Sequence, residues 1–227
     1  AMGSSRALPF PVRSAASAGR RFPAFSPDGR TLYFCSAEAK KIPEEYKEIR
    51  YNLCSIDFDP STGTFGSRID TLVNAEALGK SVSFPRPSYD GKYIMFTLSD
   101  YGNFSIWHKE ADLWLLDLTS GDLRKLSEVN SDDTESFHNW SSNSRWFVFS
   151  SRRGDGLYTR LYLASMDENG KISKPFLLPQ EDPETYYDRS VYSYNVPDFT
   201  SEPIKIDTRV FEKKITSKER IQVQAKK

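Results

Sequence analysis

Short hydrophobic stretches separated by tight polar turns run along most of this chain. In residues 25–34, the turn residues Ser-Pro-Asp-Gly come shortly before the large residues Leu-Tyr-Phe. Proline presets the backbone of such a turn, the aspartate side chain caps it, and glycine accepts a positive φ. Leucine and aromatic residues fit a pleated, buried surface. This stretch therefore predicts a turn followed by a β-strand.

The same pattern of turn and strand occurs three times. It recurs at residues 84–96 and 137–149, and the aligned serines Ser26, Ser88 and Ser141 are about 62 and 53 residues apart. Once loops are added, these spacings are within reach of the period of a propeller blade, which is roughly 40–50 residues. The repetition predicts a β-propeller rather than a single hairpin.

Each repeat continues with two further strands. We expect the third strands at 52–57, 112–117 and 160–164. After a second turn, we expect the fourth strands at 68–73, 123–126 and 176–178. Four short antiparallel strands per repeat are typical of a propeller blade. The predicted fold class is therefore all-β, with three blades that form a partial propeller.

These repeats divide the chain into segments. Before the first repeat lie a stretch typical of a leftover expression tag and a stretch typical of the end of an earlier outer strand. After the third repeat comes a tail that is first aromatic and then basic. The predicted segments are 1–5 (tag remnant), 6–20 (N-terminal segment), 21–80 (blade one), 81–133 (blade two), 134–180 (blade three) and 181–227 (tail).

The chain resembles TolB-like β-propeller proteins in three stretches: FSPDGRTLYF, PSYDGKYIMFT and WSSNSRWFVFSSRRGDGLYTRLYL. In that family an aromatic-Ser-Pro-Asp-Gly turn joins the two inner strands of each blade. The second repeat departs from the pattern at Tyr89, and the third departs at residues 142–144, which are Ser-Asn-Ser. The resemblance implies an exported protein located in the periplasm or envelope of a Gram-negative bacterium. Because three blades do not close a ring and residues after 180 do not repeat the pattern, we expect the chain to be the C-terminal portion of a longer propeller protein.

Composition and charge narrow the classes of partner. Of 227 residues, 38% are hydrophobic and 14% are aromatic, which suits a β-rich globular chain. Lys+Arg and Asp+Glu both number 31, and this balance argues against nucleic acid as a partner. No apolar run is long enough to span a bilayer, so no transmembrane segment is predicted. The sequence lacks the Gly-x-Ser-x-Gly and His-Glu-x-x-His motifs and a Gly-rich phosphate loop, so we predict neither catalytic residues nor a cofactor.

The two cysteines, Cys35 and Cys54, fall on the second and third strands of the first blade. Two interpretations are open. They are either cross-strand neighbours that form a disulfide in an oxidising compartment, or two small buried hydrophobic side chains. Their spacing fits neither a zinc motif nor a haem-attachment motif, and no metal ligands are predicted.

Three blades are too few for a closed ring, because known propellers have about four to eight. The missing blades either belong to the same polypeptide, or two copies of the chain meet about a two-fold axis as a homodimer with six blades. The tail offers two further predictions. Its aromatic part, residues 183–199, is expected to pack over a blade, and the alternation of residues 204–211 predicts a half-buried strand.

Loop lengths point to one face of the disc as functional. The loops at about 37–50, 98–111 and 151–159 and those at about 73–82 and 127–136 are long and lie on the same face. Long loops on a rigid scaffold are where binding sites usually occur. The candidate residues on this face are aromatic or basic, as binding surfaces often are: Tyr101, Trp107, His108, Arg152, Arg153 and Tyr158.

Two questions about these candidates stay open. In the alternative to a binding surface, Phe104 and Trp107 pack their loop onto its own blade and His108 is solvated. His138 replaces the proline of the other two repeats at the start of an inner strand, near Arg86 and Glu135. These three residues form a candidate site at the channel mouth for a small anion, a peptide end or a metal, although a single histidine is poor evidence for a metal site. In the alternative, His138 is a channel-wall residue bonded to a neighbouring loop.

The function predicted from the sequence is a non-catalytic binding or scaffold module that engages a protein or peptide through the long-loop face or the central channel. The alternative is an enzyme. It would be a propeller hydrolase or lyase acting on glycans, or the accessory propeller of a prolyl-oligopeptidase-like peptidase, since such peptidases carry similar blades.

Overall fold

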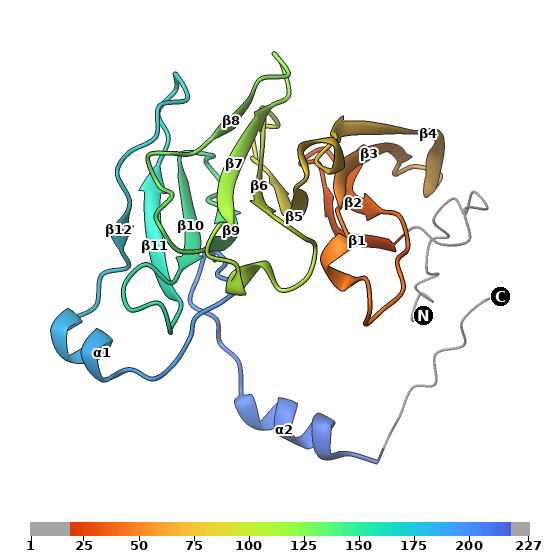
Figure 1. The fold of residues 1–227 in the computed structure, drawn as a ribbon. Coiled ribbons are helices and arrows are strands. Elements are labelled where there is room, and N and C mark those ends of the chain that lie inside the picture. The colour runs from red at the N-terminus through yellow and green to blue at the C-terminus, as the bar shows by residue number, and fades with distance from the viewer. Residues whose placement is uncertain (1–18, 219–227) are drawn as a thin grey trace.

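Three four-stranded antiparallel sheets make up the body of the protein, for which a computed structural model describes residues 19–218 (Figure 1). In each sheet the strands are ordered as in the sequence. This arrangement confirms the predicted all-β class and its four-stranded blades. The strands of blade one are β1 (Gly19–Phe25), β2 (Thr31–Ala37), β3 (Asn52–Asp59) and β4 (Thr64–Val73). Those of blade two are β5 (Ser81–Pro87), β6 (Tyr93–Ser99), β7 (Asp112–Asp117) and β8 (Leu123–Lys125). Those of blade three are β9 (Glu135–Trp140), β10 (Trp146–Ser151), β11 (Arg160–Ser165) and β12 (Phe176–Leu177).

The blades stand side by side around their first strands. Strand β1 contacts β5, and β5 contacts β9. Figure 1 shows blade two between the other two blades. The first strand of each blade is therefore the innermost, as in a propeller.

The core between the blades consists of two clusters. Strand β6 of the middle blade contributes side chains to both clusters. In β6, Ile94, Met95 and Phe96 are all fully buried. Ile94 and Phe96 pack toward blade one, whereas Met95 packs with the Phe147 and Phe149 side chains of blade three. Because successive side chains of a strand point to opposite faces, a strand between two blades is buried on both faces and carries a run of apolar residues instead of an alternating pattern. This requirement explains the continuous hydrophobic runs in the sequence.

The turn between the two inner strands of each blade has the same hydrogen bonds even where its sequence changes. In blade one, the Ser26 hydroxyl donates to the Asp28 carboxylate over 2.6 Å. In blade three, Ser141 donates in the same way to the Asn143 side chain over 2.7 Å. Ser144 takes the place of the glycine with a φ of 56°, and its hydroxyl accepts from the backbone N–H of Asp90 over 2.9 Å. A serine is therefore useful at this position because it ties the turn to blade two.

Both cysteines are buried and free, which agrees with the second interpretation of the pair. Cys35 lies opposite Leu53, and Cys54 lies opposite Phe34, so the two thiols are one step apart in register and point to opposite faces of blade one. Cys35 belongs to the core against blade two, and Cys54 to a cluster on the other side. Burial raises the pKa of both thiols.

The aromatic part of the tail packs on blade three, as predicted. It begins with helix α1 (Pro183–Arg189) and continues as an extended strap. The Ser150 hydroxyl donates to the Tyr194 carbonyl over 2.9 Å, and Thr159 donates to Asn195 over 2.8 Å. Ser150 is on the face of β10 that points away from blade two. The strap therefore occupies the side of blade three where a next blade would pack.

The prediction of a half-buried strand at 204–211 is wrong. Ile204 and Ile206 are exposed and irregular, and helix α2 covers Thr208–Thr216. The Asp207 side chain accepts from the backbone N–H of Arg209 and caps this helix. No sheet edge pairs with the segment within residues 19–218, so its alternating pattern has no partner strand to stabilise it.

Some predicted segments lie outside the described residues. These are the tag remnant at 1–5, most of the N-terminal segment at 6–20, and the last part of the basic tail. No helix among residues 19–218 is long and apolar enough to cross a bilayer.

Candidate binding surface

The loops that join the second and third strands of the blades gather at one end of the molecule. In Figure 1 they lie at the lower end, and the β7–β8 and β11–β12 turns lie at the upper end. We call the lower end the long-loop face and define it by residues 38–51, 100–111 and 152–159. The observed loops agree with the predicted ones to within a few residues.

The loop of blade two presents two aromatic side chains to solvent. Phe104 is 81% exposed and Trp107 is 65% exposed. Between them, Ser105 and Ile106 are buried in the short 3-10 helix Ser105–Trp107. The Thr134 hydroxyl donates to the Ser105 carbonyl over 3.2 Å. The loop is thus anchored from below by its middle residues, and its aromatic rings are free at the surface.

Phe104 has a backbone conformation that is unusual for a bulky residue. Its φ is 52°, and its carbonyl accepts from the N–H of Trp107 over 2.9 Å. A left-handed conformation costs such a residue about 1–3 kcal/mol. The Phe104 side chain does not offset this cost by packing into the core, because it is exposed.

Arg152 of blade three completes this aromatic group. Its guanidinium lies over the Trp107 ring, 4.5 Å from the centroid. It also donates to the carbonyl of Gly156 within its own loop. The cation–π contact joins the loops of blades two and three and limits the motion of the indole. Phe104, Trp107 and Arg152 form what we call the aromatic–arginine surface.

The other candidates of blade two are placed differently. Tyr101 packs against His108 with the ring centroids 4.1 Å apart, and against Tyr46 of blade one at 5.7 Å. His108 is buried, with its Nδ1 3.2 Å from a carboxylate oxygen of Glu110. The alternative in which Trp107 packs inward and His108 is solvated is therefore the reverse of the observed arrangement.

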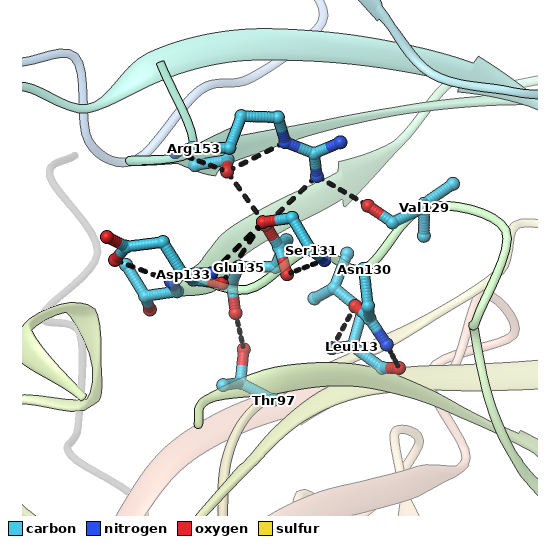
Figure 2. Close-up of polar contacts among 10 residues, drawn as sticks. Thr97, Leu113, Val129, Asn130, Ser131, Asp133, Glu135 and Arg153 are labelled. Atoms are coloured by element: carbon cyan, nitrogen blue, oxygen red, sulfur yellow. Dashed lines mark hydrogen bonds and ion pairs between the residues drawn. The ribbon is translucent and has the colours of Figure 1, made fainter. Parts of the chain in front are cut away.

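Glu135 and Arg153 form a buried ion pair beneath the third loop. Their side chains are 2.9 Å apart, and Glu135 also accepts from the hydroxyls of Ser131 and Ser151 over 2.6 and 2.8 Å. Figure 2 shows these contacts converging on the carboxylate. Burial raises the pKa of Glu135, and the hydrogen bonds and the Arg153 charge oppose that shift. Arg153 also lies over the Tyr162 ring at 4.6 Å. These two candidates therefore support the loop from inside.

Tyr158 is half-buried, with the guanidinium of Arg160 over its ring at 5.2 Å. Arg160 is buried and donates to the carbonyls of Tyr192 and Ser190 in the tail. Tyr158 therefore lies where the third loop meets the strap, beside the aromatic–arginine surface.

His138, Arg86 and Glu135 do not form one site. His138 is 2% exposed, and its Nε2 donates to the Met95 carbonyl of blade two over 2.9 Å. Burial lowers its pKa to about 3, so the ring is neutral at ordinary pH. Arg86 lines a cleft together with Phe25 and Tyr89, and its charge also helps to lower the pKa of His138. Glu135 is held by Arg153. Within residues 19–218, no group of three or more His, Cys, Asp or Glu side chains is placed to hold a metal ion.

The sequence reasoning missed an arc of phenylalanines on the innermost strands. Phe22, Phe84 and Phe137 each have a positive φ, of 56°, 53° and 49°. Their rings follow one another, each tilted by 52° to the next, with centroids 4.3 and 4.6 Å apart. The register of each inner strand shifts at these positions. The signal was present in the sequence, because each phenylalanine precedes the turn serine by the same number of residues.

No protein-family model matches the sequence, and no curated protein matches it either. Three solved structures illustrate its likeness to known folds. TolB from Acinetobacter baumannii is 19% identical over 69% of this chain and 32% of that chain, with a TM-score of 0.41. The β-propeller domain of the Trilobed protease from Pyrococcus furiosus is 17% identical over 73% of this chain and 44% of that chain, with a TM-score of 0.41. A puromycin-hydrolyzing peptidase of Mycobacterium tuberculosis is 16% identical over 73% of this chain and 24% of that chain, with a TM-score of 0.49.

These values concern the fold and not a function. The chain spans about a third of the TolB structure and less than half of the Trilobed protease domain. Its own topology sets the class of protein. Residues 19–218 contain three blades of a β-propeller, with an aromatic–arginine surface on the long-loop face.

Proposed function

We propose that this chain is a non-catalytic β-propeller module that binds a protein or peptide through the long-loop face. The observation that carries the proposal is the aromatic–arginine surface, in which Phe104 and Trp107 are exposed above a buried anchor and Arg152 covers one side of the indole. Tryptophan and arginine dominate the energetics of protein interfaces. A ring that is already held in place loses little conformational freedom when it binds.

The remaining candidates take supporting roles in this proposal. Arg153 and Glu135 hold the third loop, and Tyr101 and His108 hold the second. A periplasmic or envelope location is part of the proposal and rests on the resemblance of the repeats to TolB-like propellers. Fractionation of cells that express the full-length gene tests that location, and recovery in the cytoplasm contradicts it.

The experiment for the binding site uses a random peptide library displayed on phage, panned against the immobilised chain. Trp107→Ala should weaken the selected peptides roughly tenfold or more, as expected for an interface tryptophan worth about 2 kcal/mol. Trp146→Ala is the matched control, because Trp146 is 40% exposed at the start of β10 and contacts Phe176 instead. Peptides that bind Trp107→Ala as well as the unaltered chain, or that are lost only with Trp146→Ala, contradict the proposal.

The sequence leaves open whether two copies of the chain close a six-bladed ring. Closure through blade three requires the strap over Ser150 and Thr159 to move away. We therefore expect a monomer in dilute solution by light scattering. A dimer that survives dilution would contradict this expectation and would support the closed ring.

A further inference from the structure

Helix α2 is amphipathic, and its apolar side chains have no cover. Val210 is 62% exposed, Phe211 is 56% exposed and Ile215 is 74% exposed. The preceding Ile204 and Ile206 are also exposed, at 68% and 53%. Figure 1 shows α2 apart from the three blades, joined to them by an irregular segment. A series of exposed apolar side chains of this kind usually marks a surface that binds something.

The charge of the same segment differs from that of the rest of the chain. Residues 204–227 contain eight of the 31 Lys+Arg but only three of the 31 Asp+Glu. This segment therefore carries a formal charge of +5, and the rest of the neutral chain carries −5. The net charge of zero hides a basic, apolar end attached to an acidic body.

Phe211 and Ile215 lie apart from most of the basic side chains of the helix, whereas Val210 lies between Lys213 and Lys214. At 3.6 residues per turn, Phe211 and Ile215 share one face, and Arg209 and Lys213 lie on the other side. Lys214 lies beside the apolar face. Lysine and arginine can lay their methylene stems along an apolar boundary and keep the charge in a polar layer.

We propose that α2 binds an anionic lipid surface. A helix of low net hydrophobicity, with phenylalanine or isoleucine on one side and lysine or arginine on the other, lies in the plane of a lipid interface. Basic residues near such a surface are attracted to negatively charged headgroups. The charge of +5 is complementary to that partner.

A second copy of the chain is a poorer occupant. The net charge of −5 on its other residues would attract the helix, but its most exposed aromatic side chains, Phe104 and Trp107, lie beside the Arg152 cation, so its main apolar patch is basic rather than acidic. An anionic lipid surface has negatively charged headgroups above an apolar layer. It can therefore bind the basic and the apolar side chains of α2 at the same time, without a preformed groove.

The test is sedimentation of the full chain with sucrose-loaded vesicles. We expect binding to phosphatidylglycerol–phosphatidylcholine vesicles, at least tenfold weaker binding to pure phosphatidylcholine vesicles, and weaker binding as salt increases. The double variant Phe211→Ser, Ile215→Ser should bind the anionic vesicles at least tenfold more weakly than the unaltered chain. The double variant Lys213→Glu, Lys214→Glu should be weakened by at least as much. Thr216→Ala on the same helix is the control and should bind like the unaltered chain. Because α2 lies apart from the sheets, none of these variants should change the thermal unfolding of the blades.

Three results would overturn the proposal. The first is no sedimentation with the anionic vesicles, and the second is sedimentation that the Phe211→Ser, Ile215→Ser variant retains. The third is a self-association of the chain, seen by light scattering without lipid, that the same variant abolishes. That result would assign the helix to a second copy instead.

Discussion

Replacing Arg153 with methionine is expected to destabilise the protein by about 3 kcal/mol at pH 7. The Glu135 side chain is 0% exposed and that of Arg153 is 19% exposed, so the substitution leaves a buried carboxylate without its cation. Removal of one partner of a buried ion pair costs about 3–5 kcal/mol. The lower end is expected here because the hydroxyls of Ser131 and Ser151 still donate to the carboxylate.

The same substitution should also make stability depend more strongly on pH. Burial raises the pKa of Glu135 in the folded protein, and the Arg153 charge opposes that rise. A group whose pKa is higher in the folded state contributes stability below its unfolded pKa, and this contribution is lost as the pH rises through the folded value. Without Arg153 the folded pKa rises further. The loss of stability as the pH rises above the unfolded pKa of Glu135 should therefore be larger in Arg153→Met than in the unaltered chain.

Urea denaturation followed by tryptophan fluorescence measures both effects. With an m-value of about 1–3 kcal/mol/M, a change of about 3 kcal/mol lowers the midpoint by at least roughly 1 M. Arg68→Met is the matched control, because Arg68 is 84% exposed in its pair with Asp70. Exposed pairs contribute at most about 1 kcal/mol. A midpoint for Arg153→Met equal to that of Arg68→Met, or an unchanged pH dependence, would refute the reasoning.

Two further predictions concern packing and a buried histidine. Gly102→Ala should destabilise the protein by about 1–3 kcal/mol, because its new Cβ would overlap the ring of Tyr51. Gly154→Ala is the control and should change thermal stability little, because its new Cβ meets nothing nearer than 4.0 Å. Equal melting temperatures for the two variants would count against this prediction. The pKa of His138 is about 3 when folded and 6.5 when unfolded, so its contribution to stability is present above pH 6.5 and is lost as the pH falls. At pH 5 about 2 kcal/mol should be missing. Urea titrations at pH 5 and 7.5 should show a smaller difference for His138→Gln, and an identical difference would contradict the assignment.

The repeats made the strands predictable to within a few residues. The third strand of blade two was expected at 112–117 and is Asp112–Asp117. The fourth strand of blade one was expected at 68–73 and begins earlier, at Thr64. Local turn chemistry and apolar runs specify such elements because both act over a few residues. The segment at 204–211 shows the limit of this reasoning. Its alternation is compatible with a strand, but a strand also needs a neighbouring edge.

The candidate surface was predictable only in part. Loop length pointed to the right end of the molecule, and Trp107 and Arg152 were among the candidates. The sequence did not predict which side chains of a loop are exposed, because their exposure depends on which loop residues are buried against the blade. Ser105 and Ile106 are buried under the second loop, which leaves Trp107 outside and places His108 inside. The chemical type of these residues does not reveal this choice.

The sequence by itself determined that the chain is built of repeated four-stranded antiparallel units, because turn residues and hydrophobic runs recur at a propeller's period. It also determined that a charge-neutral chain has a basic end. Which polar residues meet depends on how the chain folds in three dimensions. The proximity of His138 and Glu135 in the sequence suggested one site, yet each is taken by a different neighbour: His138 by the Met95 carbonyl of blade two, and Glu135 by Arg153. The Met95 carbonyl and Arg153 are distant in sequence from the groups they bind, so the sequence alone does not reveal these pairs.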